Sequence, residues 1–179
     1  NVWATTSSAP GTIFFAQENA INDNPNIYFN RELVIAGSNA AAADAKFTDI
    51  QPLIYKNITV KSYNSDTTTN PGIIKAHARF PAGSMSIFNE GIFEVNNLAS
   101  FTNLGTFNID NGGGVVVKNG GDFYNGSTGL LAGQPSSRFI VDGIGSTFEN
   151  QNDVAQTLGD VFAQNGGNLT HQGNNAIAC

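Results

Sequence analysis

Cysteine is almost missing from this chain, because Cys179 is the only one among 179 residues. A single thiol cannot build the intramolecular disulfide framework that stabilises many small secreted domains. We consider two origins for Cys179: it pairs with a cysteine of another chain, or it marks a point where a longer protein continued or was cut. The fold must therefore be held by packing and hydrogen bonds.

Charged side chains are also scarce, at 12% of the chain. Residues 1–80 carry six acidic and six basic side chains, whereas residues 81–179 carry eight acidic side chains against only Lys118 and Arg138. Because phosphate binding depends on Lys and Arg, this acidic half argues against a nucleic-acid partner. No apolar run approaches the roughly 18 residues that a membrane-spanning helix requires. We therefore expect no membrane span.

Residues of the common catalytic motifs are few. His77 and His171 are the only histidines, and the chain contains no nucleophile elbow, phosphate-binding loop or zinc-protease motif. A zinc site made of His and Cys is not expected. We predict that the protein is not an enzyme and that it needs no cofactor or metal.

Glycine and asparagine are abundant instead, with 20 and 24 residues. One phrase recurs, in which Asn-x-Gly stands between apolar residues: Asn89-Glu90-Gly91, Asn103-Leu104-Gly105 and Asn119-Gly120-Gly121, with the asparagines 14 and then 16 positions apart. The flanking residues alternate in the manner of strands. Asn and Gly tolerate the positive φ of a sharp bend, so each copy predicts two short strands joined at a corner.

Short strands at a near-fixed period predict a solenoid, because no pair of them can bury its own apolar face. We predict an all-β fold, a right-handed parallel β-helix, with a single domain over residues 1–179 and its clearest coils at residues 84–169. The handedness follows from the general preference of parallel crossovers. In stacked coils, asparagine amides can form hydrogen-bonded ladders.

One helix is expected near residues 39–49. Four consecutive alanines follow a Ser or Asn that can act as the N-cap. A helix at this place would cap the open hydrophobic end of the first coil, which solenoids must cover to remain soluble.

Residues 1–16 form either the first strand of the solenoid or an N-terminal arm. A short, strongly apolar strand contains Ile13, Phe14 and Phe15. The segment before it is mostly polar but contains Trp3. Such a strand either starts the first coil or pairs with the sheet edge of a neighbouring subunit. In the second case these four side chains are buried at an assembly contact.

Acidic side chains leave a catalytic alternative open. By the spacing of the phrases, Glu94 and Asp110 fall at comparable places in successive coils, and Asp122 follows the next corner. Paired carboxylates on one sheet could cleave polysaccharides. The same row could hold a structural Ca²⁺ through carboxylate and carbonyl oxygens. A row of solvated, unrelated acids is the third interpretation, and we favour it.

Three sequons and one tyrosine are the remaining candidate sites. Asn57, Asn125 and Asn168 each begin an Asn-x-Ser/Thr triplet and are permitted glycosylation sites. A chain of this composition contains about as many triplets by chance, so their number carries no information. Tyr124 is a candidate glycan contact, and packing beside a corner is the alternative.

The phrases FNEGIFEVNN, FTNLGTFNID and VKNGGDFYNGSTG resemble the coils of β-solenoid surface proteins. Over residues 85–169 the chain is similar to the N-terminal domains of hyphally regulated fungal cell-wall proteins and to filamentous-haemagglutinin-like bacterial adhesins. The resemblance implies a right-handed parallel β-helix on a cell surface that serves adhesion or wall structure without catalysis.

We therefore expect a secreted, extracellular cell-surface protein with a structural or adhesive role. A chain that begins with Asn1 instead of Met is expected of a processed protein. Its partners are expected to be further copies of itself in a fibre, or a glycan of a cell surface. Assembly would use strand edges or open coil ends. Two rival classes remain open: a glycan-binding module and a polysaccharide-cleaving β-helix enzyme.

Overall fold

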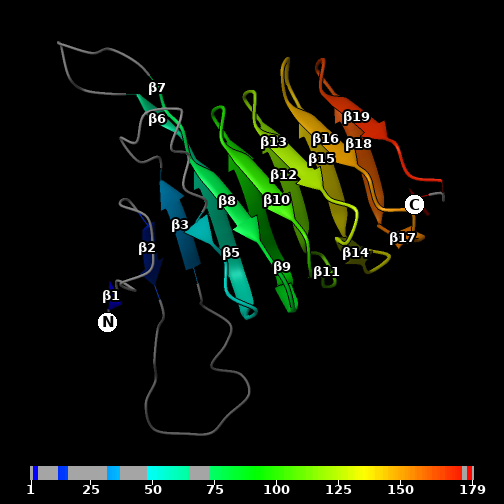
Figure 1. The fold of residues 1–179 in the computed structure, drawn as a ribbon, viewed down its shortest axis with the longest axis horizontal. Helices are drawn as coiled ribbons and strands as arrows, with labels where there is room; N and C mark the ends of the chain where they lie inside the picture. Colours follow the sequence, from blue (N-terminus) through cyan, green and yellow to red (C-terminus); the bar gives the residue numbers. More distant parts are fainter. Residues whose placement is uncertain are drawn as a thin grey trace, which may run out of the picture.

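The computed structural model describes residues 2–3, 12–15, 32–36, 48–64, 73–174 and 177–178. These residues form strands and their connections, and most of the strands stack in parallel along one axis (Figure 1). Across these ranges there is no helix that could cross a membrane. The chain is an all-β solenoid, and this part of the sequence prediction is confirmed.

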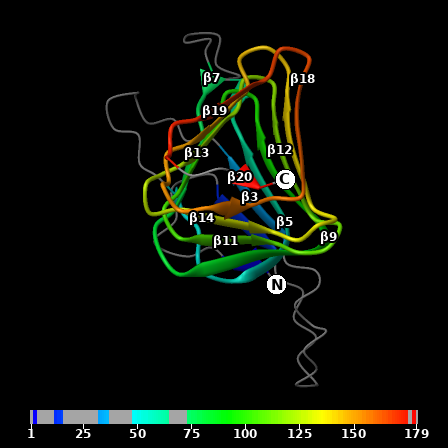
Figure 2. The same cartoon turned by 90° about the vertical axis from the view of Figure 1, so that its right-hand side faces the viewer.

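Each coil of the solenoid has three faces, which Figure 2 shows from one end. The first face contains β3 (Glu32–Ala36), the second half of β5 (Ile54–Lys61), the second half of β9 (Ser84–Asn96), β12 (Gly114–Lys118), β15 (Arg138–Asp142) and β18 (Asp160–Gln164). The second face contains β4 (Thr48–Asp49), β8 (His77–Phe80), β10 (Ser100–Asn103), β13 (Asp122–Asn125), β16 (Thr147–Asn150) and β19 (Asn168–His171). The third face contains the first halves of β5 and β9, then β11 (Thr106–Ile109), β14 (Leu130–Gly133), β17 (Gln156–Thr157) and β20 (Ile177–Ala178).

The pairing register sets the length of a coil. On the first face Ile92 pairs with Gly114, Gly114 with Arg138, and Arg138 with Asp160, so successive coils take 22, 24 and 22 residues. The intervals of 14 and 16 residues between the Asn-x-Gly phrases are therefore not the period of the solenoid. The chain turns three corners in each coil, whereas the prediction assigned one Asn-x-Gly phrase to each coil.

The three phrases lie at three different corners. The first is in the bend of β9 between the third and first faces, Asn103 ends a strand of the second face, and Asn119 follows a strand of the first face. Their assignment to corners is right, but the assumption that each phrase begins a new coil is wrong. A corner of any kind needs residues that tolerate a sharp bend, so the same phrase recurs wherever the chain turns.

Local backbone geometry explains the residues at the corners. Five described non-glycine residues have positive φ angles between 51° and 59°: Glu90, Asn97, Leu98, Asn119 and Asn165. Three of the five are asparagines, which adopt this region more readily than most residues. Gly91 is required for a different reason. A Cβ at this position would lie 1.9 Å from the carbonyl oxygen of Lys56 in the neighbouring coil.

The interior is a continuous stack of aromatic and aliphatic side chains. Inward and outward residues alternate along the strands, and the inward phenylalanines have at most 1% of their surface exposed: Phe80, Phe93, Phe101, Phe107, Phe123, Phe139 and Phe148. The centroids of neighbouring rings lie as close as 4.4 Å, for Phe139 and Phe148. Such pairs contribute about 0.5–1.5 kcal/mol each beyond the burial of their area.

The N-terminal end of the first face is antiparallel. β1 (Val2–Trp3) pairs with β2 (Thr12–Phe15), and β2 pairs with β3. The backbone of residues 12–15 therefore adds to the first coil of its own chain. The side chains of the expected assembly residues lie outside what the structure describes, and their role stays a prediction: Trp3, Ile13, Phe14 and Phe15.

Most of the helix expected near residues 39–49 lies outside the described residues. Its last two residues, Thr48 and Asp49, form β4 and pair in parallel with β8, so the helix does not reach the end of the expected range. Tertiary contacts hold them in the sheet: Thr48 is buried, and the carboxylate of Asp49 lies 2.9 Å from the guanidinium of Arg79. Between β5 and β8, β6 (Tyr63–Asn64) and β7 (Ile73–Ile74) form a separate antiparallel pair.

Candidate functional site

A column of buried amides runs along the corner between the second and third faces. Asn103, Asn125 and Asn150 end three successive strands in register, and each is 0% exposed. Nδ2 of Asn103 donates to Oδ1 of Asn125 at 2.7 Å, and Nδ2 of Asn125 donates to Oδ1 of Asn150 at 2.7 Å. The ring of His171 continues the column at 3.0 Å. This ladder gives part of the asparagine surplus a structural role, because buried polar groups need partners.

The ladder removes one of the three candidate glycosylation sites. Asn125 is fully buried, and its Nδ2 also donates to the carbonyl of Gly129 at 2.8 Å. The folded chain therefore cannot present this amide to a glycan, and the expectation for Asn125 is wrong. Asn168 is exposed at the start of β19, and Asn57 is half-buried, with its Oδ1 accepting a hydrogen bond from the amide of Ile92. Glycosylation of these two stays a prediction.

The expected row of carboxylates does not form. Glu94 lies on the first face, Asp110 lies at the corner that follows β11, and Asp122 begins β13 on the second face. The register neighbours of Glu94 are Thr59 and Val116, so neither strand beside it places a carboxylate opposite. The prediction that Glu94 and Asp110 share a place in successive coils is wrong, because it took the spacing of corners for the length of a coil.

The titratable groups are scattered over the described surface. Burial raises the pKa of the Asp110 carboxyl above its usual value. On the second face, burial and the charge of Lys75 lower the pKa of His77, whose Nδ1 lies 2.6 Å from Oγ of Ser100. In the part of the chain with described positions, no three His, Cys, Asp or Glu side chains gather where they could hold a metal ion.

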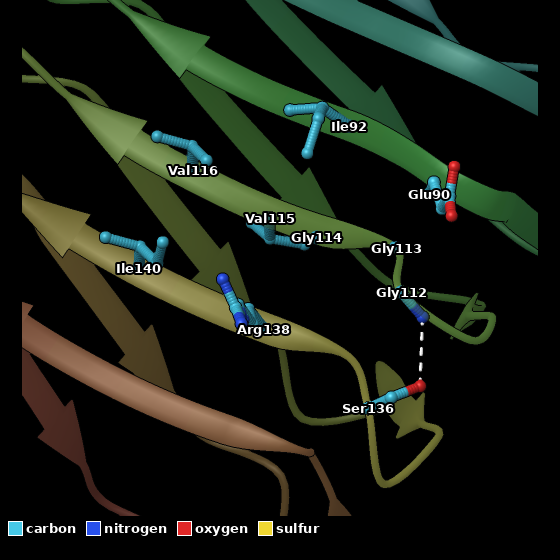
Figure 3. Close-up of a pocket in the computed structure, with 10 residues that line it drawn as sticks. All are labelled: Glu90, Ile92, Gly112, Gly113, Gly114, Val115, Val116, Ser136, Arg138 and Ile140. Carbon is cyan, nitrogen blue, oxygen red and sulfur yellow. Dashed lines mark hydrogen bonds between the residues drawn. The ribbon is translucent and has the colours of Figure 1, made fainter.

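The first face carries a shallow hollow of about 490 Å³ on its outer side, and Figure 3 shows its lining. Gly114 stands between Ile92 and Arg138 in one outward row, and its missing side chain opens the hollow. Ile92, Val116 and Ile140 supply apolar surface, while Arg138 and Glu90 supply charges of opposite sign. The amide of Gly112 donates to Oγ of Ser136 at one end of the hollow.

An apolar row extends from this hollow toward the C-terminal coil. Val116, Ile140 and Phe162 occupy the same outward position on three successive strands. Phe162 is 45% exposed. The outer side of the first face therefore exposes a row of apolar side chains to solvent, at positions where alternation would place polar ones.

Polar side chains cluster at the other end of the same face. Nζ of Lys118 lies 2.8 Å from Oε2 of Glu94, and Oε1 of Glu94 accepts a hydrogen bond from Nδ2 of Asn96 at 2.7 Å. Nδ2 of Asn119 donates to Oδ1 of Asn96 at 2.9 Å. Sequence periodicity did not single out this cluster, because it depends on the register between β9 and β12.

Tyr124 lies on the outer side of β13 and is half-buried. Its hydroxyl donates to Oε1 of Gln151, and its ring flanks Gly126, where an added Cβ would lie 3.3 Å from Cε1. The ring is thus packed beside a corner, as the alternative interpretation expected, and a role in glycan contact stays a prediction.

The last described coil leaves its interior side open. Val161 and Ala163 take the inward positions that Phe139 and Val141 fill one coil earlier. Phe139 and Val141 are 1% and 0% exposed, whereas Val161 is half-buried and Ala163 is exposed. Among the strands whose positions are described, none pairs with the outer edges of β18 and β19.

Comparison of the chain with protein-family models, curated proteins and solved structures gives no match. The fold thus defines the class, a parallel β-solenoid with three faces. Because no similar protein suggests a function, the functional proposal depends on the surface features of the solenoid described above.

Proposed function

We propose that this chain is an extracellular structural or adhesive surface protein that assembles through the open end of its coil stack. The observation that supports this proposal is the exposed interior of the last described coil, at Val161 and Ala163. The resemblance of its corner phrases to those of β-solenoid surface proteins supports the same conclusion.

The contact follows from the chemistry of a strand edge. β18 and β19 present backbone N–H and C=O groups in the spacing that another parallel strand requires. A second copy that stacks a coil on this edge satisfies those groups and covers Val161 and Leu169, both half-buried. Burial of apolar surface contributes about 25 cal/mol per Å². Repetition of the contact from copy to copy is head-to-tail and gives a fibre.

A charge at the open end tests this contact. We expect Ala163→Asp to lower the self-association constant at least tenfold, because the carboxylate would be buried between two coils without a partner. The matched control is Ser127→Asp, which adds the same negative charge at an exposed corner remote from β18. Sedimentation velocity of both variants measures the change, and equal association of the two would contradict the proposal.

Glycan binding is the second candidate, and the hollow beside Gly114 is the observation that favours it. Its apolar surface can contact the carbon face of a sugar ring, and Arg138 and Glu90 can bond to hydroxyl groups. On a glycan array, we expect Gly114→Leu to remove binding by filling the hollow, whereas Tyr124→Phe leaves it unchanged. Loss with Tyr124→Phe alone would move the site to the second face, and release of shortened glycan would indicate a cleaving enzyme.

A further inference from the structure

The polar cluster on β9 and β12 brings together an amine, an amide and a carboxylate. Lys118 and Asn96 are register partners on adjacent parallel strands, whose spacing is about 4.8 Å. Glu94 lies two positions before Asn96 and therefore on the same side of the sheet. Its Oε2 lies 2.8 Å from Nζ of Lys118, and its Oε1 accepts from Nδ2 of Asn96 at 2.7 Å. One carboxylate thus touches both the nucleophile and the leaving group of an amide exchange.

The amide carbon of Asn96 is also polarised. Nδ2 of Asn119 donates to Oδ1 of Asn96 at 2.9 Å, which places a donor where negative charge develops when an amine attacks Cγ. Asn96 is only 8% exposed. The side chain of Glu94 is 23% exposed and that of Lys118 35%. The reacting carbon is therefore better shielded from water than the amine that would attack it.

We propose that Lys118 and Asn96 form an isopeptide bond that crosslinks two neighbouring coils, with Glu94 as the catalytic proton carrier. Oε2 of Glu94 takes a proton from the ammonium of Lys118, and the neutral Nζ attacks Cγ of Asn96. The intermediate carries its charge on Oδ1. The Cγ–Nδ2 bond then breaks and the Nζ–Cγ amide remains.

Atoms and charge balance without any other reactant. Glu94 carries two protons in succession from Nζ to Nδ2, and the leaving group departs as ammonium. Nothing is oxidised or reduced, and the carboxylate is regenerated. The chain loses the mass of one ammonia, and residues 96–118 become a closed covalent ring across two coils. The inference goes beyond the proposed function and does not depend on it.

Digestion of the purified full chain tests the crosslink directly. Trypsin cuts after Arg79, Lys118 and Arg138, so an unlinked chain gives peptides 80–118 and 119–138 at full mass. An acylated Lys118 is not a trypsin site. We therefore expect one peptide, 80–138, whose mass is lower by one ammonia, with fragment ions that join Lys118 to Asn96.

Two variants assign the chemistry. Glu94→Gln keeps the shape of the side chain but cannot carry protons, and Lys118→Arg keeps the charge but removes the amine. Both are expected to restore the full intact mass, and trypsin should then cut after position 118. The matched control is Glu149→Gln, because Glu149 also accepts a hydrogen bond from an amide two residues ahead, that of Gln151. This control should keep the crosslink.

Three results would overturn the inference. The first is a wild-type chain of full mass. The second is an ammonia deficit that Lys118→Arg retains. The third is a loss of ammonia together with trypsin cleavage after Lys118. Cyclisation at the Asn119-Gly120 pair also expels ammonia, but it leaves Lys118 cleavable by trypsin. Circular dichroism verifies that the variants fold. If Glu94→Gln does not fold, the mass and the trypsin cleavage of Lys118→Arg alone test the crosslink.

Discussion

At the scale of single residues, the buried ladder of Asn103, Asn125 and Asn150 is expected to stabilise the fold. Asn125 is the middle member and is bonded on both sides. Replacing it by Ala removes both ladder bonds and the bond from its Nδ2 to the carbonyl of Gly129. Nδ2 of Asn103 keeps a bond to the carbonyl of Leu130, and Oδ1 of Asn150 keeps one from the amide of Asn152. Each of the three lost hydrogen bonds contributes about 0.5–1.5 kcal/mol. We expect Asn125→Ala to lower the free energy of unfolding by about 3 kcal/mol in a urea titration.

The matched control for this prediction is Asn168→Ala, on the same face but exposed. Its effect should stay within about 0.5 kcal/mol, as for most surface substitutions. If both variants unfold at the same urea concentration, the ladder does not stabilise the fold.

His77 is expected to make stability depend on pH. Its folded-state pKa lies below 6.5, because burial and the charge of Lys75 disfavour the imidazolium. The unfolded chain therefore binds a proton first, and the free energy of unfolding falls as pH drops through 6.5 toward the folded-state pKa. Thermal unfolding of His77→Asn should lose this part of the pH dependence, and an unchanged slope would exclude His77 as its source.

At the scale of elements, the bend of β9 depends on Gly91. A side chain there would meet the carbonyl oxygen of Lys56 at 1.9 Å. We expect Gly91→Ala to cost at least about 1–3 kcal/mol, the range for overpacking, since backbone rather than a flexible side chain must move. Chemical unfolding measures the loss.

Gly114→Ala is the control for Gly91→Ala. The nearest atom to an added Cβ at Gly114 is Cδ1 of Ile92 at 3.3 Å, and this side chain end can shift. Its stability should remain near that of the wild type. A Gly91→Ala variant that is as stable as Gly114→Ala would mean that the bend of β9 tolerates a side chain.

The sequence predicts elements well where the signal is local. Alternation along the strands and Asn-x-Gly at the corners are local patterns, and both match the structure. The pairing of strands is different, because it depends on the number of residues in every corner of a coil. For this reason Glu94 and Asp110 were expected together and lie apart, whereas Lys118 and Asn96 meet without any local signal. Antiparallel pairing of β2 with β3 was also not readable from the apolar run at residues 12–15.

At the scale of the whole molecule, the two ends of the stack differ. The N-terminal end of the first face is covered by the antiparallel strands β1 and β2, whereas β18 leaves inward positions such as Ala163 exposed. In a head-to-tail fibre the open edge of β18 therefore meets the unlike N-terminal end of the next copy, where β1 runs parallel to β3. This asymmetry is the basis for proposing a fibre with a fixed polarity.

Size-exclusion chromatography with light scattering, over a series of protein concentrations, tests the central claim most directly. One chain has a mass of 18.8 kDa. We expect the measured mass to exceed this value and to rise with concentration, and negative-stain microscopy of the heaviest fractions to show filaments. A mass of one chain at every concentration would contradict assembly through the coil end and leave adhesion by the single solenoid as the function to test.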